Sequence, residues 1–545
     1  RNKEILAFQG NLLISKDTYN IVKATLRSTN KINVNFVNGI YLETEYENLD
    51  DNIFLPKRTY TELEMSVLGK KKDAKSILFK RTGIFSEYEF NKNFSENFLA
   101  DKGQTLSDDN LKKADDFWER QRTEPLSETE QNVYKMVGEL EQVPKFKRIV
   151  KLVEILESGY INAWNSIDFG DIYSVYGNNE VEGDRIRAGA RTYFSPNDMW
   201  RIAGYTAYGF KDQKLKYGLE GRYMFNRNNR ATIGFGSRND VIQLGAQLMN
   251  DDGIMTRSFA SSSVFSSGTN ASLSLVKQNS FFFSLEPVKN FEVRMDASLQ
   301  NIKSANPEKF NLGFYKNDQL KSELKDFHTT FSLIARPGAK YSQYGVDRYA
   351  FTTLSPTFVL KFTHGFENVL DGDFDYNKLQ FLYSQPVVVG NLGRSVINFE
   401  AGKNFSTVPL ALQNIIPGNQ SYSLVPNTFA LLKYYEFVAD AYTTLNYEHH
   451  FQGKILAHLP LIKKLKFREV VFLRGAYGTL SDASRNINVE NFKYSAPDQQ
   501  IYYEYGFGLE NIGFGNLRIL RVDFNWRGNY LDRPDVSKFG VKFGL

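Results

Sequence analysis

Residues 214 to 226 read Lys-Leu-Lys-Tyr-Gly-Leu-Glu-Gly-Arg-Tyr-Met-Phe-Asn, a segment in which two kinds of side chain alternate. Leucine, tyrosine, phenylalanine and one glycine occupy every second position from Leu215 to Phe225, whereas Lys216, Glu220 and Arg222 lie between them. Successive side chains of a strand point to opposite faces, so this strand has one apolar and one charged face. A tilted strand needs about 9 to 11 residues to cross a bilayer. The stretch therefore predicts one strand of a transmembrane β-barrel, with lipid on one side and a polar lumen on the other.

The same alternation continues from residue 182 to the end of the chain. It is clearest in residues 186–194, 291–300, 501–510 and 539–545. About fifteen segments qualify as strands, and because single-chain barrels of this type have an even number, we expect sixteen, with fourteen as the alternative. A soluble β-sandwich or propeller also alternates, but strands there average about 5 to 6 residues. The expected fold class is an all-β membrane protein, a transmembrane antiparallel β-barrel over residues 182–545.

Two regions precede the expected barrel. Residues 99–181 change to a helical period and predict a linker, or a plug for the lumen, in which Ser127 and Glu130 have the spacing of a capping box and Pro144 begins a second helix. Residues 1–98 predict a curved periplasmic β-sheet domain, because turn-forming residues separate five strand-like segments. These segments are residues 5–15, 19–26, 32–46, 58–68 and 76–90.

The lengths of the connections predict which end of the barrel faces the periplasm. With an even number of strands, both ends of the barrel segment lie on the periplasmic side, where the turns are short. Residues 212–214 and 512–516 are therefore expected as periplasmic turns, and residues 406–432 and 480–499 as long outer loops.

Composition excludes several classes of protein. The 44 Phe and 31 Tyr are dispersed among polar residues, and no apolar run approaches the roughly 18 residues that a membrane-spanning helix needs. The chain has no cysteine, which excludes disulfides, thiolate catalysis and Cys-based metal sites. The 67 basic residues are interspersed with 62 acidic ones, so we expect no nucleic-acid partner.

The sequence shows no constellation typical of an enzyme or a metal site. His449 and His450 are neighbours on a strand and point to opposite faces, so they are poorly placed to share one metal ion. The Asp371-Gly-Asp-Phe-Asp375 run imitates the start of a calcium loop, but Tyr376 takes the glycine position and Leu382 stands where the closing Glu belongs. No nucleophile elbow is present. We therefore expect neither catalysis nor a cofactor.

Three groups of residues are candidates for function. The apolar face of the N-terminal sheet is a candidate client face, and small residues on the first and last barrel strands form a candidate seam that either opens laterally or simply fits a crowded lumen. The third group is charged and is expected to line the lumen. The client face comprises Val34, Phe36, Ile40 and Leu42; the seam comprises Gly189, Gly540 and Gly544; the lumen lining comprises Arg187, Arg191, Glu220, Arg222, Glu292 and Arg294.

Several motifs resemble a Bacteroidota outer-membrane family of unknown function that usually follows a carboxypeptidase-regulatory-like domain. The resemblance is carried by Phe117-Trp118-Glu119 with Glu124-Pro125-Leu126, by residues 179–187 (Asn-Glu-Val-Glu-Gly-Asp-Arg-Ile-Arg) leading into Gly189, and by residues 522–534. It implies an outer-membrane barrel and covers nearly the whole chain. The first residues show no secretory signal, and we expect such a signal, and the upstream domain, to lie before Arg1.

The end of the barrel is also similar to the BamA/TamA insertase and two-partner-secretion superfamily, through residues 505–509 (Tyr-Gly-Phe-Gly-Leu) and 515–519 (Gly-Asn-Leu-Arg-Ile). That resemblance implies sixteen strands and a role in insertion or transport. The chain departs from the superfamily because residues 406–432 lack its Arg-Gly pair and no repeated βααββ module precedes the barrel. The N-terminal sheet resembles the half-barrel of periplasmic lipoprotein carriers.

These observations leave three hypotheses for the function. The first is export or assembly at the outer membrane, in which the periplasmic sheet receives lipoproteins or unfolded barrel proteins and the barrel passes them on. The second is a passive or selective channel, and the third is a structural subunit of an envelope complex. All three imply outer-membrane lipids as partners, and the sequence does not decide among them.

Overall fold

The computed structural model describes residues 7–29, 34–50, 53–66, 76–93, 113, 115–164, 166–246, 271–341, 345–348, 350, 354–489, 494–533 and 535–544. The chain divides into two compact units. One unit comprises Arg1–Ile149, Ile455–Phe467 and Glu510–Leu520, and the remaining residues form the other. Every helix in the described ranges is too short or too polar to span a bilayer.

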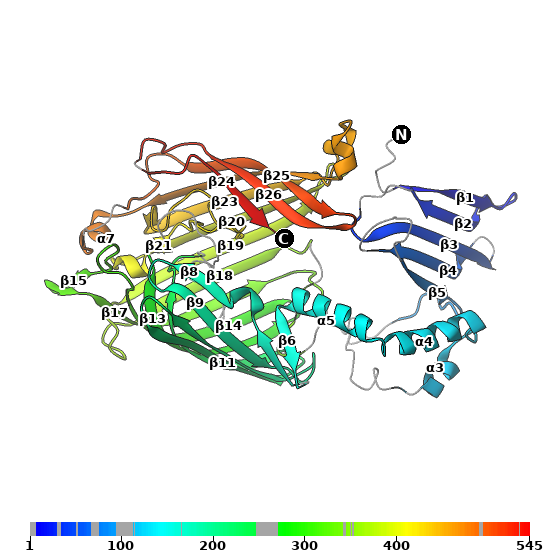
Figure 1. Ribbon diagram of the computed structural model, residues 1–545, viewed down its shortest axis with the longest axis horizontal. Helices are drawn as coiled ribbons and strands as arrows, with labels where there is room; N and C mark the ends of the chain where they lie inside the picture. The colour runs from blue at the N-terminus through cyan, green and yellow to red at the C-terminus, as the bar shows by residue number, and fades with distance from the viewer. Residues whose placement is uncertain are drawn as a thin grey trace. The chain divides into compact units, whose positions relative to one another are not determined.

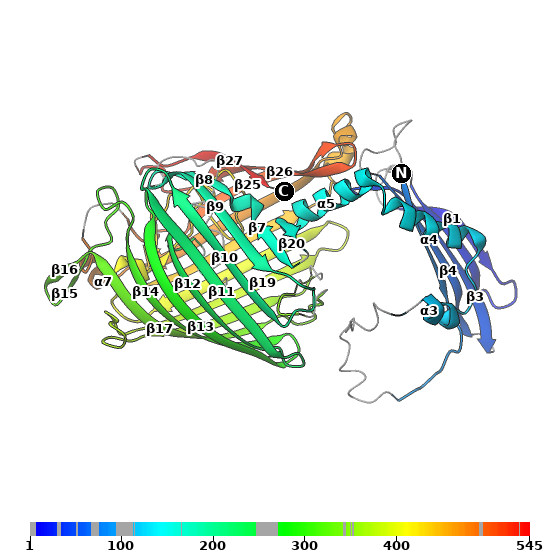
Figure 2. The same ribbon diagram turned by 60° about the horizontal axis from the view of Figure 1, so that its bottom comes forward.

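The larger unit is built on one antiparallel sheet that is rolled into a barrel (Figures 1 and 2). Consecutive long strands are neighbours around the wall, as expected for an up-and-down barrel. In the described ranges these strands are β9 (Gly183–Thr192), β10 (Trp200–Gly209), β11 (Lys214–Asn226), β12 (Ala231–Ile242), β13 (Ser274–Val288), β14 (Phe291–Ser304), β17 (Glu323–Ala335), β18 (Thr357–Gly365), β19 (Tyr376–Val388), β20 (Arg394–Asn404), β23 (Ala441–His450), β24 (Arg468–Thr479), β25 (Tyr502–Phe514), β26 (Leu517–Arg527) and β27 (Phe539–Gly544).

The first strand of the barrel is broken into short pieces. Strands β7 (Ile167–Gly170) and β8 (Tyr176–Asn179) both pair with β9, and β6 (Tyr160–Ala163) pairs with β7. Counted over the described residues, fifteen long strands and this broken one give the sixteen that we expected. The sheet therefore begins near residue 160, before the expected boundary at 182, because pieces of four residues carry too little alternation to be recognised as strands.

Strand β11 shows why the alternating sequence forms the wall. Leu215 and Phe225 are 65% and 52% exposed on the outer face, whereas Lys216 and Glu220 are 1% and 7% exposed on the inner face. Burying charged groups is favourable only where they find partners, which the polar interior supplies. The predicted alternation of an apolar outer and a polar inner face is confirmed in this strand.

The antiparallel order assigns every connection to one of two ends of the barrel. We call the end with residues 227–230, 289–290 and 515–516 the turn end, and the end with residues 366–375, 405–440, 480–489 and 494–501 the loop end. Residues 210–213 join β10 to β11 at the loop end. Residues 212–214 and 512–516 were both expected as turns on one side, the periplasmic side. The structure places them at opposite ends of the barrel, so this expectation is wrong, because a short connection can occur at either end.

The smaller unit contains a five-stranded antiparallel sheet in the order β1-β2-β3-β4-β5, as the five segments of the sequence predicted. Strand β3 begins at Val37, so the predicted strand starts later than residue 32; Val34 and Phe36 precede it, and Phe36 has a positive φ of 66°. The strands are β1 (Phe8–Ile14), β2 (Ile21–Ser28), β3 (Val37–Asp50), β4 (Ile53–Met65) and β5 (Ile77–Ile84).

Where the structure describes the chain after this sheet and before the barrel, it contains three α-helices: α3 (Asp115–Gln121), α4 (Glu128–Leu140) and α5 (Pro144–Ser158). The capping box predicted at Ser127 and Glu130 is present at the start of α4, and α5 begins at Pro144 as expected. Helix α3 lies within residues 99–181, which were expected to be helical, although no separate helix was named there. Its seven residues are Asp-Asp-Phe-Trp-Glu-Arg-Gln. They contain no pair of apolar residues three or four positions apart, so the sequence gives little sign of an amphipathic helix.

Candidate functional site

Residues 405–440, which we call the plug loop, fold inward at the loop end of the barrel. Residues 412–421 are buried throughout, as are residues 428–432. The plug loop contains a short 3₁₀ helix, Leu410–Leu412, and the paired strands β21 (Asn414–Ile415) and β22 (Val438–Ala439). Residues 406–432, expected as a long outer loop, lie at the loop end with 480–489, but they fold inward, because this removes their apolar side chains from solvent.

The plug loop joins an apolar core at the loop end of the barrel. Strand residues Val241, Ile302 and Leu324 are at most 2% exposed and pack in one cluster with Leu410 and Tyr435 of the plug loop. Each fully buried aliphatic or aromatic side chain contributes about 1.5 to 3 kcal/mol. A second cluster joins the plug loop to β25 and to the connection after β26. Its members are Ile416, Phe429, Leu432, Phe437, Ala439, Tyr442, Ala476, Tyr502 and Tyr530.

The plug loop also binds the backbone of the last barrel strand. The amide of Phe543 donates to the carbonyl oxygen of Tyr422 (2.8 Å), and the amide of Leu424 donates to the carbonyl oxygen of Phe543 (2.8 Å). Phe543 lies opposite Val522 of β26, and the N–H and C=O of one residue in an antiparallel strand point to the same side. Both groups of Phe543 therefore point away from β26, toward the seam of the barrel.

Side chains on the inner face of β27 hold the same segment. Lys542, 4% exposed, donates from Nζ to the carbonyl oxygens of Asn419 (2.7 Å) and Ser421 (2.5 Å). A Cβ at Gly540 would lie 2.7 Å from Leu431 Cδ2, and one at Gly544 would lie 2.7 Å from Leu424 Cδ1. The two glycines thus leave room for leucines of the plug loop.

Gly189 does not meet these two glycines. It pairs with Tyr205 of β10, and a Cβ at Gly189 would lie 2.3 Å from the carbonyl oxygen of Gly170 in β7. Strands β6 to β8 come between β9 and β27 in the order of the barrel. The expected pairing of Gly189 with Gly540 and Gly544 is therefore corrected: the seam lies between the broken first strand and β27.

Two charged residues of β25 and β26 complete the attachment of the plug loop. Glu504, which is fully buried, accepts hydrogen bonds from the amides of Ala430 (2.7 Å) and Leu431 (2.9 Å). Arg527 Nη2 lies 2.7 Å from Glu436 Oε1. Neither residue was a candidate from the sequence, although Glu504 is a lone carboxylate among aromatic residues and could have indicated an inward anchor.

A buried ion cluster at the loop end fixes the turn between β8 and β9. Arg185 contacts Glu182 (2.8 Å) and Asp240 (2.7 Å), and Lys216 contacts Glu182 (2.9 Å). Asn179 Oδ1 accepts from the amide of Glu182 at 2.8 Å. This arrangement gives a physical role to the segment 179–187, which carried the family resemblance.

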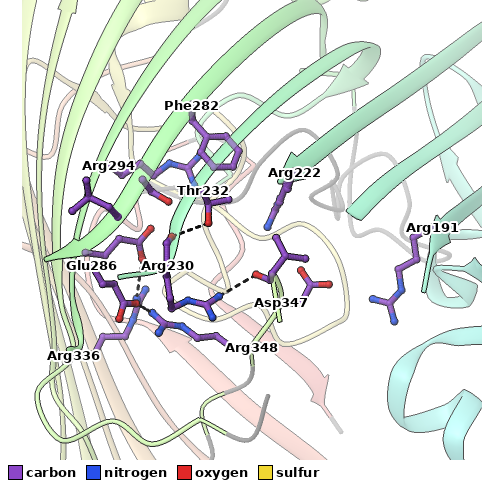
Figure 3. A pocket seen from close by; sticks show the side chains of 14 residues that line it. Arg191, Arg222, Arg230, Thr232, Phe282, Glu286, Arg294, Arg336, Asp347 and Arg348 are labelled. Atoms are coloured by element: carbon purple, nitrogen blue, oxygen red, sulfur yellow. Dashed lines mark hydrogen bonds and ion pairs between the residues drawn. The ribbon is translucent and has the colours of Figure 1, made fainter. Parts of the chain in front are cut away.

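The six lumen-lining candidates lie inside the barrel. Four of them line one cavity, and Arg187 and Glu220 do not. Arg187 stacks over the ring of Tyr205, 3.9 Å from its centroid. Glu220 is buried and forms an ion pair with Arg222. The other four candidates are associated with a cavity of about 460 Å³, which is shown in Figure 3. Its lining includes Arg191, Arg222, Glu292 and Arg294.

Two of the client-face candidates lie on one face of the N-terminal sheet. Ile40 pairs with Leu63 of β4, which pairs with Phe79 of β5, and directly paired residues share a face. Leu42 pairs with Leu26 of β2. Val34 is 38% exposed and precedes the strand, as does Phe36. Ile40 and Leu42 therefore belong to an apolar face, and Val34 and Phe36 lie next to it in sequence.

The carboxylates considered as calcium ligands bind lysine side chains and a backbone amide. Asp373 accepts from Lys321 Nζ (2.5 Å) and from the amide of Lys325 (2.8 Å), and Asp371 forms an ion pair with Lys325. The ring of His449 contacts Ser395 Oγ at 2.8 Å. Within the described ranges, no three His, Cys, Asp or Glu side chains gather closely enough to hold a metal ion.

The fold and this site define the class of protein, a β-barrel in which a buried plug loop packs against the inner face of the wall at the loop end. The chain belongs to the family of unknown function DUF5686, because the model of that family's C-terminal domain matches residues 157–483. The family resemblance found in the sequence is thereby confirmed. The Bacteroidota origin and the upstream domain stay predictions. No curated protein matches the chain.

Solved structures of other barrels are similar at low identity. BamA from Haemophilus ducreyi lacking POTRA domains 1–3 is 12% identical over 69% of this chain and 70% of that chain, with a TM-score of 0.38. CdiB from Acinetobacter baumannii is 11% identical over 68% of this chain and 57% of that chain, with a TM-score of 0.35. CdiB from Escherichia coli is 12% identical over 70% and 62%, with a TM-score of 0.37. The chain spans less than two thirds of both CdiB proteins.

Proposed function

We propose that this protein acts in export or assembly at the bacterial outer membrane, moving surface lipoproteins or barrel proteins into or across the membrane. The apolar outer face of strands such as β11, where Leu215 and Phe225 are exposed, supports insertion in a lipid bilayer. The long connections at the loop end support an extracellular position for that end. The N-terminal sheet is then periplasmic.

The observation that carries this proposal is the pairing of Phe543 with the plug loop. The backbone groups of a closing strand normally pair with the first strand, which leaves a barrel without edges. Here the amide and the carbonyl group of Phe543, which both point to the seam, form hydrogen bonds with the backbone of Tyr422 and Leu424. If the plug loop is displaced, an extended client segment can take its place by pairing with β27, a common mode of peptide recognition.

The packed loop end argues against the alternative of a passive channel. A diffusion channel needs a continuous polar path through the lumen. The described residues instead place an apolar core there, including Leu410 and Tyr435, which are each 1% exposed. The client path in this proposal therefore runs along the seam and does not pass through a permanently open pore.

A disulfide between the plug loop and the last strand tests the proposal. Leu424 Cβ lies 3.4 Å from the position that a Cβ at Gly544 would occupy, close to the separation of about 3.5 to 4.5 Å found in disulfides. Because residues 1–545 contain no cysteine, Leu424→Cys with Gly544→Cys introduces a single pair within them. In cells that depend on this variant, oxidation is expected to lower the amounts of surface lipoproteins and folded barrel proteins several-fold, and a reductant is expected to restore them.

The two single-cysteine variants are the matched controls, because they change the same positions without forming the bond. Migration on cold SDS gels checks that all variants remain folded barrels. Wild-type amounts of both client classes in cells whose protein is fully disulfide-bonded would rule out transfer through the seam.

A further inference from the structure

A polar cavity of about 460 Å³ lies inside the barrel near the turn end. Arg230 immediately precedes β12, and Arg336 immediately follows β17, so both lie where their strands end. The volume falls within the range of about 300 to 1,000 Å³ that is usual for small-molecule sites. The cavity is separate from the plug loop, none of whose residues lines it.

Arginine dominates the lining. The lining contains six arginines, Arg191, Arg222, Arg230, Arg294, Arg336 and Arg348, against the three carboxylates of Glu286, Glu292 and Asp347. Figure 3 shows the side chains of Arg191 and Arg222 on one side of this space and those of Arg336 and Arg348 on the other. A guanidinium has five N–H donors in a planar fork, which matches the oxygens of phosphate and carboxylate groups.

Carboxylates outside the lining orient some of these arginines. Asp168 lies 3.0 Å from Arg191 Nη2, and Asp296 lies 2.7 Å from Arg294 Nη2. Such partners offset part of the positive charge, so the net charge alone does not identify a ligand. They also fix the direction of each guanidinium, which lowers the entropic cost of binding a ligand.

Arg222 and Arg336 both line the cavity, and the side chain of each is about one-third exposed. Arg222 is 34% exposed and uses Nε for its ion pair with Glu220. Arg336 is 32% exposed, and the nearest atom of its partner Glu292 lies 3.9 Å from Nη1, beyond ordinary hydrogen-bond length. Both side chains therefore retain N–H groups that are able to contact a ligand in the cavity.

We propose that this cavity binds a phosphate group, with Arg222 and Arg336 as the principal contacts on opposite sides. Phosphate carries more charge and more acceptor oxygens than a carboxylate, and so fits a site where several arginines converge. In the envelope the same chemistry is available from free phosphate or from the headgroup of a phospholipid. The site is independent of the export proposal, because it lies at the other end of the lumen from the plug loop.

Calorimetric titration of the purified full-length protein in detergent tests this inference. Inorganic phosphate and a short-chain phosphatidylglycerol are the two probes, and native mass spectrometry of protein extracted from membranes reports phospholipid that stays bound. The double variant Arg222→Gln, Arg336→Gln is expected to bind at least tenfold more weakly than the wild type. Arg227→Gln is the matched control, because Arg227 lies at the same end of the barrel but does not line the cavity.

The two probes separate the sources of the phosphate group. Binding of both probes indicates a site for free phosphate, whereas binding of phosphatidylglycerol alone, with retained phospholipid, indicates a headgroup site. Cold SDS gels show whether the double variant remains folded. If the wild-type protein binds neither probe, or if the double variant and Arg227→Gln bind equally well, the inference is wrong.

Discussion

The amino group of Lys542 on the last strand donates to the carbonyl oxygen of Asn419, 123 residues earlier in the chain, at 2.7 Å. The same amino group reaches the carbonyl oxygen of Ser421. Lys542 thus holds the plug loop from the inner face of β27, while the backbone of Phe543 holds it at the edge. Two kinds of contact on adjacent residues tie one loop to the strand that closes the barrel.

Replacing Lys542 with methionine is expected to loosen the plug loop. The substitution keeps an unbranched side chain but leaves the buried carbonyls of Asn419 and Ser421 without this donor, at a cost of about 1 to 3 kcal/mol each. The amides of Leu424 and Phe543, which donate the hydrogen bonds between the plug loop and β27, should then exchange hydrogen faster, as measured by mass spectrometry. Lys538→Met is the control, because Lys538 is exposed. Equal exchange in both variants would show that Lys542 is not an anchor.

Removing the inner part of the plug loop is expected to create a conducting pore. The wild-type protein should show little conductance in planar bilayers, because apolar side chains fill the loop end. Replacement of residues 417–432 by a short Gly-Ser linker should give stable openings in the same assay. Shortening the exposed connection 455–465 between β23 and β24 is the control. Large openings in the wild type would instead favour the channel.

The long strands and the capping box could be predicted because their signals are local. Strand β11 alternates over its whole length, and Ser127 with Glu130 lie only three residues apart. The pieces β6 to β8 were missed because each has four residues, too few for a clear period. The turn formed by residues 210–213 was also expected at the wrong end of the barrel relative to residues 515–516. The length of a connection is only a statistical indicator of the end at which it lies.

The candidate site depends on contacts that no local pattern reveals. Lys542 is one of several inward lysines in the sequence, and only the fold shows that it meets Asn419. One usable signal was present, since Val408, Leu410 and Ile415 are more apolar than expected for a loop in water. The glycines of β27 were named as candidates from the sequence, but they face leucines of the plug loop and do not contact Gly189.

The buried ion cluster at the β8–β9 turn is expected to contribute strongly to stability. Asp240 accepts from both terminal nitrogens of Arg185 (2.7 and 2.9 Å) and from the hydroxyl of Tyr205 (2.7 Å). Asp240→Ala leaves Arg185 with one fewer buried partner, and breaking a buried pair costs about 3 to 5 kcal/mol. Urea unfolding followed by tryptophan fluorescence measures this change. Asp498→Ala, at an exposed position, should change the unfolding free energy by less than about 0.5 kcal/mol.

The capping box of α4 is expected to make this helix sensitive to acid. The carboxylate of Glu130 accepts from the hydroxyl (2.7 Å) and the amide (2.8 Å) of Ser127, and these hydrogen bonds, the hydroxyl first, hold the pKa of Glu130 below its usual range. A lowered pKa in the folded state means that the stabilisation is complete above the unfolded pKa of about 4.3. The stabilisation is lost as the pH falls through the folded-state pKa.

Ser127→Ala should therefore speed exchange at the Glu130 and Gln131 amides at neutral pH, since loss of an N-cap costs about 0.5 to 2 kcal/mol. After correction for intrinsic exchange rates, the difference from the wild type should shrink as Glu130 becomes protonated. Glu128→Gln is the matched control, because Glu128 lies in the same turn but is not part of the capping box. A Ser127→Ala effect that stays constant from neutral pH to pH 3 would show that the Glu130 carboxylate contributes nothing to the cap.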